Sequence, residues 1–200
     1  MRAVMKSVPP NLCEKIASGE CTVLVSKTTP KLKIPFKCYI YCTNEQHELE
    51  VLLIDDMDHR VIVGDYRNAE NGLNIGNGKV IGEFICDKVY NIISIDPLPW
   101  GGALDYAFKF DFKKTCLSVE EFNNCLDGGS GYGIHISDLK IYDKPKELRE
   151  FRKPCIFEGK DTICYLFCIH CKSNGGLFFD CDRRITRPPK SMYYVEELAN

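Results

Sequence analysis

Apolar and polar residues alternate along several short runs of this chain, and these runs are rich in valine, isoleucine, tyrosine and phenylalanine. A period of two, bounded by turn-forming residues, is typical of β-strands. The pattern predicts strands at residues 22–25, 36–42, 60–63, 79–86, 89–95, 132–142 and 192–198. The signal is clearest over residues 79–95, where we expect a long core strand that bends at Gly82.

Two short helices are predicted. Pro9 and Pro10 favour a helix start, and Gly19 is placed to end that helix. Its apolar side chains share one helical face: Leu12, Cys13, Ile16 and Ala17. Ser118 and Glu121 have the spacing of a capping box, which predicts a second helix with Phe122 and Leu126 on its apolar face. We therefore expect the chain to open in the order helix, strand, loop, strand.

Length and composition favour one α+β domain over residues 1–200. The chain has 200 residues, of which 44% are hydrophobic and 27% charged, as is ordinary for a folded domain. No apolar run approaches the roughly 18 to 20 residues that cross a bilayer, and the opening residues lack the apolar stretch of a secretory signal. We expect a cytoplasmic protein with no membrane contact, whose 12 cysteines stay reduced.

Charge is distributed unevenly, although the net charge is only -2. Residues 1–43 are basic and predict a positive face, whereas residues 44–77 are strongly acidic. We interpret residues 44–78 as an acidic insertion, which offers a surface for a protein partner. The pI near 6.1 disfavours indiscriminate binding to long duplex DNA, because that mode depends on many phosphate contacts. A local site for nucleic acid or nucleotide remains compatible with this charge.

Cysteines are densest in a C-terminal insertion at residues 152–186. Cys168 and Cys171 form a C-x-x-C pair, and tetrahedral zinc needs two further ligands from elsewhere in the chain. The preferred structural zinc set is Cys155, Cys168, Cys171 and Cys181, with Cys164 or His170 as substitutes. The alternative is that these thiols pack as small hydrophobes. Cys38, Cys42 and Cys86 fall inside strand patterns, where we expect core thiols.

Six segments, taken in order, resemble phage and prophage proteins with an ASCH domain, a branch of the PUA-like superfamily. They are residues 7–10 (SVPP), 15–22 (KIASGECT), 35–42 (PFKCYIYC), 78–84 (GKVIGEF), 135–145 (HISDLKIYDKP) and 185–191 (ITRPPKS). The resemblance implies a small closed β-barrel with flanking short helices. It also implies a cleft beside the strand after Gly19 that holds RNA, single-stranded nucleic acid, a nucleotide or a modified nucleoside.

One branch of that family hydrolyses acylated cytidine with Lys, Thr and Glu side chains, on the pattern Gly-x-Lys-Thr-x-Glu-x-Arg. Residues 19–26 read GECTVLVS, so Cys21, Leu24 and Ser26 replace the Lys, the Glu and the Arg. Because these replacements remove the proton-transfer groups, the resemblance implies a non-enzymatic binding module. An amidohydrolase acting on acylated nucleosides and a phage-encoded protein-interaction module are the alternatives. Cys21 could act as a nucleophile with His135 as its base only if the two side chains were in contact, and the sequence does not indicate that they are.

The candidate ligand-binding residues combine that resemblance with side-chain chemistry. Lysines supply positive charge, although solvated surface lysines are the simpler interpretation. Aromatic side chains offer stacking surfaces for bases. The candidate set is Ser7, Lys15, Thr22, Ser26, Lys27, Lys31, Trp100, Tyr132 and His135.

Overall fold

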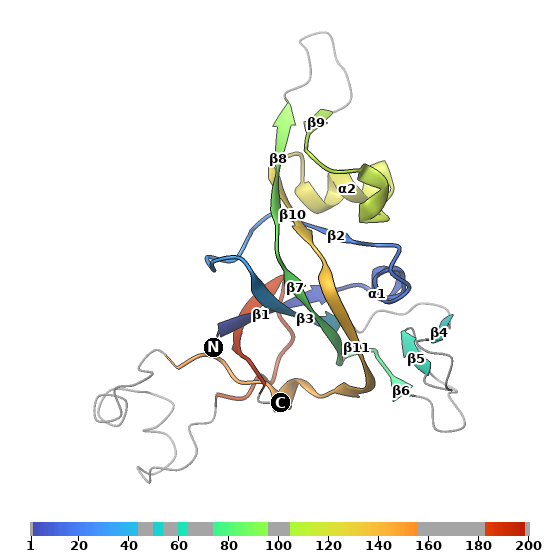
Figure 1. Cartoon of the computed structure of the whole chain (residues 1–200), viewed down its shortest axis with the longest axis vertical. Helices are drawn as coiled ribbons and strands as arrows, with labels where there is room; N and C mark the ends of the chain where they lie inside the picture. The colour runs from blue at the N-terminus through green and yellow to red at the C-terminus, as the bar shows by residue number, and fades with distance from the viewer. Residues whose placement is uncertain are drawn as a thin grey trace.

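Most of the regular secondary structure in the described chain is β-strand, arranged in three sheets (Figure 1). The computed structural model describes residues 2–43, 50–53, 60–63, 74–95, 105–155 and 183–198. The five-stranded sheet has the order β11 (Ser137–Lys146), β7 (Val80–Cys86), β3 (Phe36–Cys42), β1 (Arg2–Val8) and β12 (Met192–Glu196). The four-stranded sheet has the order β2 (Val23–Ser26), β10 (Gly131–His135), β8 (Val89–Ile95) and β9 (Asp105–Ala107).

The third sheet is small and consists of β4 (Glu50–Leu53), β5 (Arg60–Val63) and β6 (Asn74–Ile75). The short strand predicted at residues 60–63 is therefore confirmed. These strands lie within the predicted acidic insertion at residues 44–78, most of whose other residues are outside the described chain. The proposal that this insertion engages a protein partner stays a prediction.

Two short helices accompany the sheets. Helix α1 (Pro10–Ala17) begins after the extended Pro9, and Gly19 follows it with φ +80°. Helix α2 (Val119–Leu126) begins with the predicted capping box: Glu121 N–H donates to Ser118 Oγ at 3.2 Å, and Ser118 N–H donates to Glu121 Oε2 at 2.7 Å. Both helices bury the apolar face that the sequence predicts. Within the described residues, no helix is both long and apolar enough to span a bilayer.

The chain opens with a strand that the sequence pattern did not reveal. β1 pairs in parallel with β3 and antiparallel with β12, so the first residues lie inside the five-stranded sheet. The expected order of helix, strand, loop, strand was therefore wrong. β1 forms because of its pairing with β3 and β12, and neither of these strands is next to it in the sequence.

Two long ribbons connect the larger sheets (Figure 1). β7 continues into β8 after Asp87 and Lys88, and β10 continues into β11 after Ile136. The single long strand predicted over residues 79–95 is thus divided at residues 87–88, and the pairing of β7 with β3 shifts register beside Gly82. Gly82 also permits close strand packing, because a Cβ atom there would lie 2.6 Å from the Lys140 carbonyl oxygen.

The closed barrel expected from the resemblance is not formed by the described strands. β2 and β12 each pair with a single neighbour, so both larger sheets keep open edges. β1 cannot extend the four-stranded sheet, because both of its edges are already paired, with β3 and with β12. β1 and β2 approach each other through side chains. The two strands are joined there by a side-chain hydrogen bond from Lys6 Nζ to Ser26 Oγ at 3.0 Å, while neither is a ladder partner of the other. The fold is an α+β arrangement of bent, open sheets.

The five-stranded sheet has a core on each face. Alternate residues of β1 and β3 point to opposite sides, so Val4 and Ile40 join one cluster while Met5 and Tyr39 join the other. The first cluster contains residues of α1, β2 and β10, and it buries the three cysteines predicted as core thiols. The second contains Phe151, whose ring packs edge-on against Tyr39 with centroids 4.9 Å apart. A third, smaller cluster joins α2 to the four-stranded sheet.

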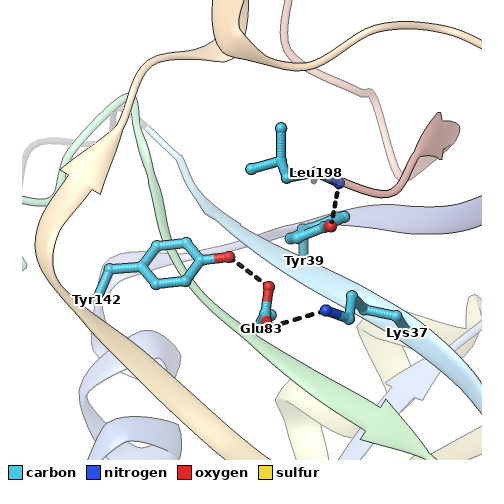
Figure 2. A network of polar contacts seen from close by, with 5 residues as sticks. All are labelled: Lys37, Tyr39, Glu83, Tyr142 and Leu198. Carbon is cyan, nitrogen blue, oxygen red and sulfur yellow. Dashed lines mark hydrogen bonds and ion pairs between the residues drawn. The ribbon is translucent and has the colours of Figure 1, made fainter. Parts of the chain in front are cut away.

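A polar network lies on the second face of the five-stranded sheet (Figure 2). Glu83 accepts a hydrogen bond from the Tyr142 hydroxyl at 2.6 Å and another from Lys37 Nζ at 3.0 Å. Nearby, the Tyr39 hydroxyl accepts from the Leu198 backbone N–H at 2.9 Å. Burial opposes the charge on Glu83, but the bonds from Tyr142 and Lys37 outweigh it and hold the pKa of the carboxyl below 4.5.

Candidate functional site

A cavity of about 610 Å³ opens at the place where β1 and β2 meet without main-chain pairing. We call it the seam cavity. It is lined by parts of β1 and α1, by the end of β2, by the segment before α2, by α2 itself, and by the segment before β12. The described lining residues are 6–9, 11, 12, 15, 24–28, 116, 117, 121, 124, 125, 190 and 191. Its volume is in the range of small-molecule binding sites.

Strand alternation places a lysine at this cavity. Val4, Lys6 and Val8 occupy alternate positions of β1, and the two valines belong to the core cluster on the α1 side. Lys6 therefore points to the same side, where only 7% of its surface is exposed. Ser26, at the end of β2, is 3% exposed and accepts the hydrogen bond from Lys6. A buried lysine amine and a buried hydroxyl thus meet at the wall of the cavity.

The charge on Lys6 has little compensation. Within the described residues, Lys6 forms no ion pair with a carboxylate. Burial lowers the pKa of Lys6 from 10.5, and the thiols of Cys38 and Cys125 act weakly in the other direction. The physical cause is that a low-dielectric site disfavours the charged form of an amine.

Three further lysines line the seam cavity. Lys15 Nζ donates to the Cys116 carbonyl oxygen at 3.0 Å and is partly buried. Lys27 is exposed and pairs with Asp127 at 3.0 Å, and the Asp127 side chain is 82% exposed. Lys190 is exposed. Because an exposed ion pair contributes only about 0 to 1 kcal/mol, Asp127 holds Lys27 weakly.

Helix α2 contributes the single carboxylate among the described lining residues, Glu121. The backbone N–H of Ser118 donates to this carboxylate, and that bond, followed by the bond to the Ser118 side chain, lowers the pKa of Glu121. Glu121 therefore stays ionised at neutral pH while it caps its own helix. Asn124 and Cys125 lie one turn further along α2 and are exposed at the same cavity.

Four of the predicted ligand-binding residues come together at the seam cavity: Ser7, Lys15, Ser26 and Lys27. Four others are described but do not line it: Thr22, Lys31, Tyr132 and His135. The hydroxyl of Thr22 is buried, with no hydrogen-bond partner in the described chain. The Lys31 backbone N–H donates to the Tyr194 hydroxyl at 2.8 Å, close to β12. Trp100 lies outside the described residues.

Tyr132 and His135 of β10 do not line the seam cavity. They stand in register with Ser26 and Val23 of β2. His135 Nδ1 lies 2.6 Å from Asp87 Oδ1, and this contact lowers the pKa of the exposed Asp87 carboxyl. The Tyr90 ring packs edge-on against the His135 ring, with centroids 6.4 Å apart. These residues form a separate surface cluster.

The structure does not support Cys21 as a nucleophile. Its thiol is buried and donates to the carbonyl oxygens of Val23 and Thr115. Burial, together with the neighbouring Cys116 thiol, raises the pKa of Cys21 to about 12. A thiol that stays protonated at neutral pH is a poor nucleophile. His135 contacts Asp87 instead, and no described hydrogen bond joins it to Cys21.

The predicted zinc set falls almost entirely outside the described residues. Cys155 is described and partly buried, whereas Cys168, Cys171 and Cys181 are not described. Among residues 2–43, 50–53, 60–63, 74–95, 105–155 and 183–198, no cluster of His, Cys, Asp and Glu has the arrangement of a metal site. The structural zinc site at residues 152–186 stays a prediction.

Sequence reasoning missed Lys6, Lys190 and the α2 residues of the cavity. Lys190 lies directly after Pro188 and Pro189, in one of the segments that carry the resemblance. That resemblance was the sequence feature that pointed to this part of the site. Lys6 interrupts the apolar run of residues 3–8, and a lysine that interrupts such a run is a candidate for a buried charge. Its contact with Ser26, 20 positions away, had no signal in the sequence.

Comparison with known proteins gives similarity to solved structures alone. No protein-family model matches the chain, and no curated protein sequence matches it. The crystal structure of ASCH from Zymomonas mobilis is similar over 98% of this chain and 88% of that chain, with 14% identity and a TM-score of 0.44. A point-mutant form of the same protein gives 13% identity, coverage of 98% and 91%, and a TM-score of 0.44. Similarity at this level assigns neither a family nor an activity to the chain.

Proposed function

We propose that the seam cavity binds a nucleotide or a short segment of single-stranded RNA, with its exposed lysines in contact with phosphate groups. The observation that carries this proposal is the charge of the lining. Lys15, Lys27 and Lys190 are at least partly exposed there, against Glu121 as the single described carboxylate. A concave site with an excess of one charge concentrates ligands of the opposite charge.

The remaining lining residues suit a ligand with a flat, partly apolar body. Leu12, Leu24 and Leu117 provide aliphatic surface, while Ser7, Asn11 and Asn124 offer hydrogen-bonding groups. The described lining contains no aromatic side chain, so bases would not be stacked between rings there. We therefore expect contacts with phosphate and sugar to dominate and discrimination between bases to be weak.

The proposal is tested by fluorescence anisotropy with labelled single-stranded RNA oligonucleotides over a series of salt concentrations. Unlabelled mononucleotides serve as competitors and show whether one nucleotide is sufficient. Replacing Lys27 and Lys190 together by Gln removes two cations from the mouth of the cavity. We expect the double variant to bind at least tenfold more weakly, with a shallower dependence of affinity on salt, because two phosphate contacts are lost.

Two matched variants separate this site from general positive charge. Replacing Lys140 and Lys144 by Gln makes the same change in net charge at two exposed positions of β11, which do not line the cavity. We expect that variant to bind within twofold of the wild type. Replacing Asp127 by Asn frees Lys27 from its ion pair and should strengthen binding. Equal losses in the two lysine pairs, or no binding of any tested RNA or nucleotide by the wild type, would refute the proposal.

A further inference from the structure

Lys6 and Ser26 form a pair whose geometry goes beyond ligand binding. Lys6 comes from β1 and Ser26 from β2, which belong to different sheets, and their side chains meet at 3.0 Å. Both residues are at least nine-tenths buried, yet both line the seam cavity. A hydroxyl and an amine at hydrogen-bond distance, within reach of a ligand-sized cavity, have the arrangement of a nucleophile and its base.

The surroundings favour the neutral amine. A protonated Lys6 would carry three donor hydrogens, and Ser26 is its described acceptor. The other titratable side chains that line the cavity are Lys15, Lys27, Lys190, Glu121, Cys116 and Cys125, and Cys38 approaches Lys6 from β3. Glu121 is held by its own capping box and forms no described ion pair with Lys6. Burial lowers the pKa of Lys6 and acts in the same direction.

We propose that Ser26 is a nucleophile in acyl transfer from small esters or amides that enter the seam cavity, and that Lys6 is its general base. This activity is additional to nucleotide binding and does not depend on it. It also departs from the expectation that hydrolytic chemistry is absent, because that expectation considered only the replacements at residues 21–26. Lys6 reaches Ser26 from another strand, so the local motif could not reveal the pair.

The steps balance without a metal or an oxidant. The Ser26 hydroxyl transfers its proton to the neutral Lys6 amine while its oxygen forms a bond to the acyl carbon. The bond from that carbon to the leaving group breaks, and the leaving alcohol or amine takes the proton from Lys6. Water then transfers a proton to Lys6 and attacks the acyl-serine carbon. Ser26 leaves with that proton, and a carboxylic acid is released.

Cys125 is the main competing nucleophile, because its thiol is exposed at the same cavity, whereas Cys116, the other lining thiol, is partly buried. The His135 and Asp87 pair is not a competitor at this site, since neither residue is among the lining residues. An experiment must therefore distinguish an acyl group on Ser26 from one on Cys125. The distinction is chemical as well as positional, because thioesters are cleaved by neutral hydroxylamine far faster than serine esters.

The test uses the full-length chain, with p-nitrophenyl acetate as the acyl donor and a fluorophosphonate as a trapping reagent. Release of p-nitrophenol gives the rate, and tandem mass spectrometry of the trapped wild type locates the adduct without any variant. We expect the adduct on Ser26. Ser26→Ala and Lys6→Met should each lower the acylation rate at least tenfold, whereas Cys125→Ala should stay within twofold of the wild type. Far-UV circular dichroism checks that each variant is folded.

The pH profile provides a readout that a merely structural role for Lys6 would not change. In the wild type the rate should rise with pH and level off with a midpoint below 10.5, as Lys6 loses its proton. In Lys6→Met this rise should disappear. An adduct on Cys125 or at a surface residue, an unchanged rate in Ser26→Ala, or the same pH profile in Lys6→Met would overturn the proposal. Lys140→Gln with Lys144→Gln, at positions away from the cavity, should keep the activity. The acylation assay contains no nucleotide, so failure of nucleotide binding and failure of acyl transfer are distinguishable.

Discussion

Replacing Glu83 by Gln removes the negative charge at the centre of the polar network on the five-stranded sheet (Figure 2). The side chains of Glu83 and Lys37 are 18% and 19% exposed, so their interaction is only weakly screened by solvent. A hydrogen bond to a charged group contributes about 1.5 to 3 kcal/mol. The amide of Gln retains one acceptor oxygen for Tyr142 or Lys37, so one charged bond is lost. We expect the free energy of unfolding to fall by about 2 kcal/mol at pH 7.

The same variant has a defined dependence on pH. Folding lowers the pKa of Glu83, so its carboxylate stabilises the protein above pH 4.5 and loses that effect as the pH falls through the folded-state pKa. The difference between wild type and Glu83→Gln should therefore be full at pH 7 and shrink below pH 4.5. Urea denaturation followed by circular dichroism at both pH values measures it.

Asp127→Asn is the matched control, because it removes one charge from an ion pair that is largely exposed. We expect a change within about 0.5 kcal/mol. The interpretation of the network is wrong if Glu83→Gln also stays within 0.5 kcal/mol of the wild type at pH 7. It is equally wrong if the deficit is the same on both sides of pH 4.5.

Three further predictions concern other parts of the chain. A Cβ atom at Gly131 would lie 2.8 Å from the Ser26 carbonyl oxygen. Gly131→Ala should therefore lower the free energy of unfolding by about 1 to 3 kcal/mol in urea denaturation. In the control Gly129→Ala, the nearest contact is at 3.4 Å, so the loss should be less than half as large. Burial lowers the pKa of Lys6, so the unfolded chain binds this proton more tightly than the folded chain. The free energy of unfolding of the wild type should therefore rise as the pH approaches 10.5. The same dependence of stability on pH in Lys6→Met would contradict this. Elemental analysis of freshly purified protein should find about one zinc per chain if Cys155, Cys168, Cys171 and Cys181 are ligands. A metal-free chain would mean that these thiols pack as small hydrophobic side chains instead.

Local signals predicted most of the secondary structure. Alternation sufficed for β3 and β8, and the capping box at Ser118 and Glu121 marked the start of α2 correctly. These features depend on neighbouring residues, which a sequence pattern contains. Glycine is the usual local signal for a bend, so the sequence predicted one at Gly82. The close packing of Gly82 against β11 had no such signal, because it depends on a segment nearly 60 residues away.

The candidate site was only partly predictable for the same reason. Ser7, Lys15, Ser26 and Lys27 were identified from their neighbourhood in the sequence, and they do line one cavity. Lys6 was not identified, because β1 had no clear alternation and its position depends on pairing with β3 and β12. The expected barrel is not formed either, because β1 is paired on both edges and meets β2 through side chains alone.

The central claim is that the seam cavity between β1 and β2 is the ligand site, and NMR mapping of backbone amides tests it most directly. A mononucleotide such as guanosine monophosphate is titrated into isotope-labelled protein, and the shift changes are placed on the fold. We expect the largest changes at Ser7 of β1, at Ser26 and Lys27 at and just after the end of β2, and at Asn124 of α2. Changes confined to the surface around Tyr90 and His135, or no changes at saturating nucleotide, would contradict it.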